Sequence, residues 1–140
     1  MPTVTQSKIL DHDVRTVYDQ WTQFEEFPRF MESVDRIEQI DDKHLHWVAS
    51  FSGSRHEWDA EITEQVPDQR VAWRSVDGKT NAGEVTFRSM DAGTTVITVQ
   101  MDWEPEGLKE KVGGALGFDD HRVAGDLDRF ERVLDERGDR

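Results

Sequence analysis

The fold is decided by a stretch that reads HLHWVASFSGSRHEWDAEI between residues 44 and 62. On both sides of its central Ser-Gly-Ser turn signal, apolar residues alternate with polar or small ones. A period of two is typical of a β-strand that has one apolar face and one polar face. Two such segments joined by a short turn that contains glycine predict a β-hairpin.

The same alternation extends over residues 34–103 and is interrupted by turn signals at 41–43, 67–68, 77–79 and 91–93. These turns divide the region into about six strands, a density typical of an antiparallel meander. One face of the sheet is expected to be apolar, because the residues of one parity are Leu45, Trp47, Ala49, Phe51, Trp58, Ala60, Ile62, Val71, Trp73, Val85, Phe87, Ile97, Val99, Met101 and Trp103.

Helical patterns flank the meander on both sides. Residues 4–10 are strand-like, and the Asp11-His12-Asp13 sequence then provides a cap for a short helix. A broken second helix around Pro28 carries Phe24, Phe27 and Phe30. A long helix over 119–137 has an apolar stripe made of Val123, Leu127, Phe130 and Leu134. One apolar sheet face and one amphipathic helix predict an α+β fold in which they pack together.

Composition bounds the function. A chain of 140 residues without repeats or linkers predicts a single domain over 1–140. The net charge of -13 opposes binding to nucleic acid and to anionic membranes, and it also fits a salt-rich host. The absence of cysteine excludes disulfides and thiol chemistry. With neither a signal-like start nor an apolar run of roughly 18 residues, we expect a cytoplasmic protein without a stable membrane anchor.

Residues 14–19 and 24–31, the strand around Trp58 and the closing segment 126–132 together resemble the START-like (SRPBCC) superfamily. This superfamily includes polyketide cyclase/dehydrase, coenzyme Q-binding and lipid-transfer proteins, and the resemblance covers nearly the whole chain. It implies a helix-grip fold, in which a curved antiparallel sheet of about six to seven strands wraps a long C-terminal helix, with two short helices after the first strand.

The resemblance also implies a cavity between sheet and helix that accepts an apolar small molecule. The glycines at 107, 113, 114 and 117 suggest a lid, or alternatively a plain connector. Each apolar side chain facing the cavity has core filling as its alternative role. The expected lining residues are Phe24, Phe27, Phe30, Trp47, Phe51, Trp58, Ala60, Ile62, Trp73, Phe87, Val99, Met101, Trp103, Phe118, Val123, Leu127 and Phe130.

Catalytic residues are harder to identify. The resemblance to the cyclases of the superfamily implies a cavity Tyr that acts together with Ser and Arg side chains to orient the polyketide and to move protons. In this sequence the approximately aligned residues are Val34, Ala60 and Ile62. General acid–base chemistry therefore lacks its expected groups. The substitutes to inspect are Arg55, His56, Glu57 and Glu64, although a strand end beside a turn is more often solvated.

Metal and cofactor signals are weak. The His44-Leu45-His46 segment places two imidazoles on one strand face, but without Cys or an obvious third ligand we expect no metal site. The acidic pairs at 25–26 and 119–120 are interpreted as helix-start charges. Because the chain has no phosphate loop and no dinucleotide fingerprint, we expect no cofactor.

Three functions remain open. The leading hypothesis is a carrier, sensor or chaperone for an isoprenoid quinone, a lipid or an aromatic polyketide, which needs an apolar cavity and no catalytic group. The alternative is a polyketide aromatase/cyclase or dehydratase, which requires a titratable side chain in the cavity. The third is a protein-interaction module, since the superfamily also resembles chaperone activators and a ribosome-binding toxin. The superfamily implies a monomer or a homodimer.

Overall fold

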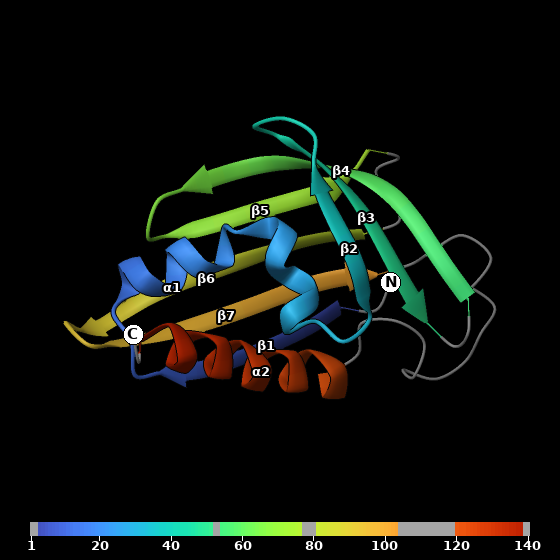
Figure 1. Cartoon of the computed structure of the whole chain (residues 1–140). Coiled ribbons are helices and arrows are strands. Elements are labelled where there is room, and N and C mark those ends of the chain that lie inside the picture. Colours follow the sequence, from blue (N-terminus) through green and yellow to red (C-terminus); the bar gives the residue numbers. More distant parts are fainter. Residues whose placement is uncertain (1–2, 52–53, 77–80, 104–119, 139–140) are drawn as a thin grey trace.

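Seven antiparallel strands form one curved sheet in the order β1-β7-β6-β5-β4-β3-β2 (Figure 1). The structure is a computed structural model that describes residues 3–51, 54–76, 81–103 and 120–138. Its strands are β1 (Thr3–Leu10), β2 (Val34–Gln39), β3 (His44–Phe51), β4 (Ser54–Val66), β5 (Arg70–Ser75), β6 (Asn81–Asp91) and β7 (Thr94–Trp103). The predicted meander is confirmed, and the first strand joins its far edge.

Pairing between β1 and β7 places the first strand at one edge of the sheet, and β2 forms the other edge. Thr3 lies opposite Asp102 and Leu10 lies opposite Thr95, so the first strand runs antiparallel to the last. Register irregularities occur in β2 after Val34, in β4 after Ile62 and in β6 after Ser89. Such bulges increase the local bend and twist of a strand, which favours a curved sheet over a flat one.

Three helical segments cover the inner face of the sheet. They are α1 (Val14–Trp21), the 3-10 helix η1 (Phe24–Arg29) and α2 (Asp120–Gly138). The predicted cap of α1 is confirmed, since the Asp13 carboxylate accepts hydrogen bonds from the Thr16 N–H at 3.3 Å and the Thr16 hydroxyl at 2.7 Å. Figure 1 shows α2 running along the β1 side of the sheet, with α1 and η1 beside it. This arrangement confirms the predicted helix-grip fold.

The core lies between these helices and the inner face of the sheet. Every residue of the predicted apolar face whose side chain is described is buried. The side chains of Phe51 and Trp103 lie outside the described part of the chain. From α2, Val123, Leu127 and Phe130 enter the same core, as the helical stripe predicted. Within the described ranges, no helix is both long enough and apolar enough to cross a membrane.

Candidate functional site

A small internal space of about 10 Å³ lies between α2 and β7. Its volume suits one water molecule or one hydroxyl group. The space lies where the helix-grip resemblance predicted a cavity, but the described side chains pack closely around it. It is lined by Trp21, Phe30 and Met31 from the α1–η1 region, by Val99 and Met101 from β7, and by Val123, Asp126 and Leu127 from α2.

Among the described residues that line the space, Asp126 is the one with a charged side chain, and only 7% of it is exposed. Its Oδ1 accepts a hydrogen bond from the backbone N–H of Glu32 at 3.2 Å and another from the Arg129 guanidinium at 2.5 Å. Burial raises the pKa of Asp126, while the Glu32 N–H and Arg129 act in the opposite direction. A titratable carboxyl group is therefore fixed in an otherwise apolar wall.

Further polar contacts join this part of α2 to the segment between η1 and β2. Arg129 Nε donates to the carbonyl of Phe30 at 2.9 Å. Arg122 donates to the Ser33 hydroxyl at 3.1 Å, and its guanidinium lies 3.7 Å from the Glu32 carboxylate. These contacts hold one side of the internal space in place. On the solvent side of them lies an open hollow of about 350 Å³.

The tryptophan nitrogens differ in their partners. Trp73 Nε1 donates to Asn81 Oδ1 at 2.8 Å, and the Asn81 amide donates to the Asp102 carbonyl at 2.9 Å. The indole nitrogens of Trp21 and Trp47 are buried with no hydrogen-bond partner among the described residues. Trp21 also lines the internal space, so a residue whose indole N–H has no described partner and a residue with a carboxylate belong to one site.

The aromatic residues expected to line a cavity mostly pack against one another. Trp47 stacks on Trp58 with ring centroids 5.4 Å apart and on Trp73 at 6.0 Å. Phe30, Val99, Met101, Val123 and Leu127 line the internal space. The other expected lining residues with described side chains are buried in the same core without lining that space, namely Phe24, Phe27, Trp47, Trp58, Ala60, Ile62, Trp73, Phe87 and Phe130. Phe118 and the glycines at 107, 113, 114 and 117 lie outside the described residues.

None of the four catalytic candidates named from the sequence lines the internal space. The register places Arg55 and Glu57 on the outer face of β4, where their side chains form an ion pair at 3.2 Å. Glu64 pairs with Arg70 at 3.0 Å. His56 is half-buried and lies opposite the buried Ala49. The described titratable group at the site is therefore Asp126.

The two histidines of β3 contact carboxylates on the outer face. His44 Nδ1 lies 2.9 Å from Asp41 Oδ1. His46 lies between Asp59 at 2.7 Å and Glu57 at 3.0 Å, and hydrogen bonds to these carboxylates raise the pKa of His46. In the described part of the chain, no group of three or more His, Asp or Glu side chains is arranged to hold a metal ion.

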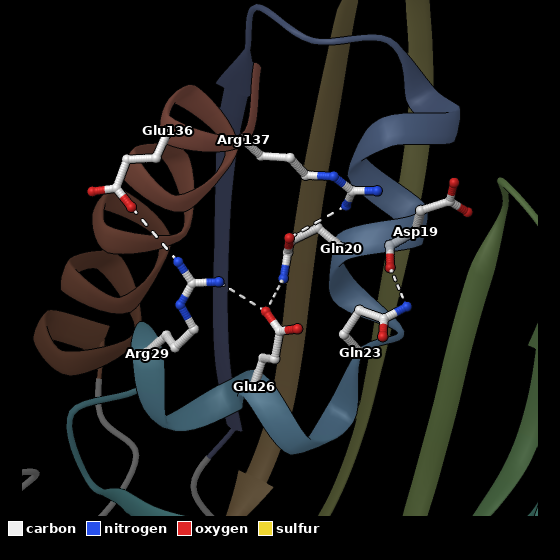
Figure 2. A network of polar contacts seen from close by, with 7 residues as sticks. All are labelled: Asp19, Gln20, Gln23, Glu26, Arg29, Glu136 and Arg137. Atoms are coloured by element: carbon white, nitrogen blue, oxygen red, sulfur yellow. Dashed lines mark hydrogen bonds and ion pairs between the residues drawn. The ribbon is translucent and has the colours of Figure 1, made fainter. Parts of the chain in front are cut away.

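A second polar cluster joins the end of α2 to α1 and η1 (Figure 2). Gln20, only 3% exposed, donates to Glu26 at 3.1 Å and accepts from Arg137 at 3.3 Å. Arg29 donates to Glu26 at 2.8 Å and lies 3.6 Å from Glu136. The hydrogen bonds from Gln20 and Arg29 lower the pKa of Glu26. Because its donors and acceptors are mutually paired and its charges balance, this cluster holds the helices together.

Sequence reasoning missed Trp21, Met31 and Asp126 as lining residues. The apolar stripe predicted for the last helix, which consists of Val123, Leu127, Phe130 and Leu134, does not include Asp126. Yet it lies three residues after Val123 and seven residues before Val133, and both of these valines are buried. Positions three and seven apart share one helix face, so this spacing was a usable signal for a buried carboxylate.

The chain is similar to known proteins over nearly its whole length. Residues 10–130 match the family model described as polyketide cyclase / dehydrase and lipid transport. An uncharacterized 17.2 kDa protein from Streptomyces lincolnensis is 50% identical over 139 residues, which is 99% of this chain and 93% of that protein.

Three solved structures share the fold. A protein from Deinococcus radiodurans has a TM-score of 0.77 and 26% identity over 94% of this chain and 95% of its own. A START superfamily protein from Mycobacterium smegmatis has a TM-score of 0.72 and 12% identity, covering 96% of this chain and 95% of its own. The Zhui aromatase/cyclase from a Streptomyces species has a TM-score of 0.74 and 12% identity, covering 97% and 94%.

Proposed function

Because this chain belongs to the polyketide cyclase / dehydrase and lipid transport family, we propose that it binds a hydrophobic small molecule between the sheet and α2. In this proposal the protein acts as a carrier, sensor or chaperone for an isoprenoid quinone, a lipid or an aromatic polyketide. It works in the cytoplasm as a monomer or homodimer. The observation that carries the proposal is the internal space, whose described lining residues are apolar except for the carboxylate of Asp126 and include Trp21, an aromatic residue with an unpartnered indole N–H.

Binding requires the core to open around the ligand. A space of about 10 Å³ is far smaller than a typical ligand site of about 300 Å³ or more. Met31 and Met101 line it, and methionine side chains are unbranched and adapt readily to new neighbours. Movement of these two side chains, together with displacement of α2 from the sheet, provides room. Contact between the ligand and the apolar core then offsets the cost of opening.

Native mass spectrometry of protein purified without detergent, followed by solvent extraction, tests this proposal. We expect a stoichiometric apolar ligand, or binding of members of a panel of quinones, lipids and aromatic polyketides. Met101→Trp fills the internal space and should weaken binding at least about tenfold. The matched control is Met90→Trp, because Met90 is 56% exposed. A protein that carries no ligand and binds nothing in the panel contradicts the proposal and favours the interaction module.

The alternative, a polyketide aromatase/cyclase or dehydratase, is favoured by one observation. Asp126 is a buried titratable group at the site, and burial raises its pKa, which favours the protonated form that a general acid needs. The test incubates the protein with a poly-β-keto substrate and follows cyclised or dehydrated product. Under this alternative, Asp126→Asn abolishes turnover while the substrate still binds. Unchanged turnover in that variant removes Asp126 from the chemistry.

A further inference from the structure

We propose that the molecule bound by this protein carries a hydroxyl group, and that this group occupies the internal space between Trp21 and Asp126. In this arrangement the hydroxyl donates to Asp126 Oδ2 and accepts from the Trp21 indole N–H. The inference rests on the proposed function and specifies the chemical class of the ligand. It favours a phenol, an enol or an alcohol on an apolar body.

The acceptor is the second oxygen of Asp126. Both described hydrogen bonds to this carboxylate, from the Glu32 N–H and from Arg129, go to Oδ1. Oδ2 receives none from any described residue, although the side chain is only 7% exposed. A carboxylate oxygen has two acceptor sites, so Oδ2 keeps its capacity to accept a hydrogen bond. A ligand hydroxyl that donates to Oδ2 forms a charge-assisted hydrogen bond, which is stronger than a bond between neutral groups.

The donor is the indole N–H of Trp21, a residue that is 1% exposed. This N–H is buried and has no acceptor among the described residues. The indole is held by rings on several sides, with centroid distances of 5.1 Å to Phe27, 5.6 Å to Phe30 and 5.4 Å to Phe130. Because the surrounding rings leave little freedom to turn, a ligand acceptor is the direct way to satisfy the N–H.

A hydroxyl group fits this pair better than other polar groups do. It donates one hydrogen bond and accepts others, so one atom satisfies both the carboxylate and the indole. A carbonyl oxygen accepts only and would face the carboxylate oxygen. An ammonium group donates only and would face the indole N–H. The volume of about 10 Å³ also matches a single hydroxyl, and Arg129 already balances the charge of Asp126.

The first test uses the unmodified protein and three probes with one apolar body: β-naphthol, its methyl ether and naphthalene. Calorimetry gives the three dissociation constants. We expect β-naphthol to bind at least about tenfold more tightly than the methyl ether, because only the naphthol donates to a charged acceptor. Equal affinities overturn the hydroxyl inference and leave apolar binding intact. Failure of all three probes to bind overturns both the inference and the proposed function.

The second test uses a matched pair of variants on α2. Asp126→Asn replaces the acceptor, whereas Asp128→Asn changes an exposed carboxylate on the same helix. We expect the preference for β-naphthol over its ether to fall to about twofold or less in the first variant and to persist in the second. A preference retained in a folded Asp126→Asn protein overturns the inference.

If Asp126→Asn does not fold, the indole proton resonance of Trp21 in the unmodified protein replaces it as the readout. β-Naphthol should shift this resonance downfield and naphthalene should not, because only the naphthol brings an oxygen to the N–H. The resonance is assigned with Trp21→Phe. Equal shifts with both probes overturn the inference.

Discussion

Asp126 and Asp128 lie close together on α2, and each forms an ion pair, but their surroundings differ. Asp126 is 7% exposed and pairs with Arg129, whereas Asp128 is 60% exposed and pairs with Lys8 of β1. Burial raises the pKa of Asp126, and the hydrogen bond from Lys8 lowers the pKa of Asp128. One side of α2 therefore carries a carboxylate that belongs to the site, and the other carries one that attaches the helix to the sheet.

Of the changes considered on the two sides of α2, removal of Arg129 should lower the free energy of unfolding most. Arg129→Met leaves a buried carboxylate without its cation and also breaks the contact with the Phe30 carbonyl. We expect a loss of about 3 kcal/mol in the free energy of unfolding, at the low end for a buried pair because Arg129 is 32% exposed. Urea denaturation measures this loss.

Arg132→Met is the matched control, since Arg132 is exposed on the same helix. It should change the free energy of unfolding by less than about 0.5 kcal/mol. A similar small loss in Arg129→Met would show that the inner ion pair is no more important than a surface charge.

The buried face of the sheet was predictable from the sequence, whereas the volume of the internal space was not. Alternation such as Leu45, Trp47 and Ala49 identified the buried face of the sheet, because a strand exposes each face at every second residue. The volume left inside was not predictable, since it depends on how rings such as Trp47 and Trp58 stack in three dimensions.

The polar residues of the site were harder to predict than its apolar wall. Asp126 was overlooked because acidic residues on helices are usually solvated, and its compensating partners come from distant segments. The Glu32 N–H and the Phe30 carbonyl reach α2 because the segment after η1 lies against this helix in the folded structure. Long-range contacts of this kind leave no local signature in a single sequence.

The two aspartates should have opposite effects on how stability depends on pH. Folding raises the pKa of Asp126 above its ordinary value of 3.8. The stability that Asp126 contributes is therefore fully present below pH 3.8 and is lost as pH rises through the pKa of the folded state. Asp128, with its lowered pKa, contributes above 3.8 and loses that stability as pH falls through its folded value.

Denaturation of the wild type, Asp126→Asn and Asp128→Asn between about pH 3 and about pH 7 tests these signs. The stability difference between wild type and Asp126→Asn should decrease as pH rises. The difference for Asp128→Asn should increase as pH rises, chiefly at the acid end. Slopes of the same sign for both variants would mean that the two carboxylates share one environment, against the comparison drawn from their burial.

The smallest expected effect is the loss of the outer contact between α2 and β1. Lys8 lies 2.9 Å from Asp128 and 3.4 Å from Glu131, and both carboxylates reach solvent. Lys8→Met should cost less than about 1 kcal/mol, because exposed ion pairs gain little over their hydrated partners. The cost should shrink further in concentrated salt, which screens exposed charges more than buried ones.

Urea denaturation at low and high salt measures both the cost of Lys8→Met and its dependence on salt. A loss as large as that of Arg129→Met, unchanged by salt, would mean that α2 is held to β1 as firmly as to the site, and that ligand entry by displacement of the helix is disfavoured.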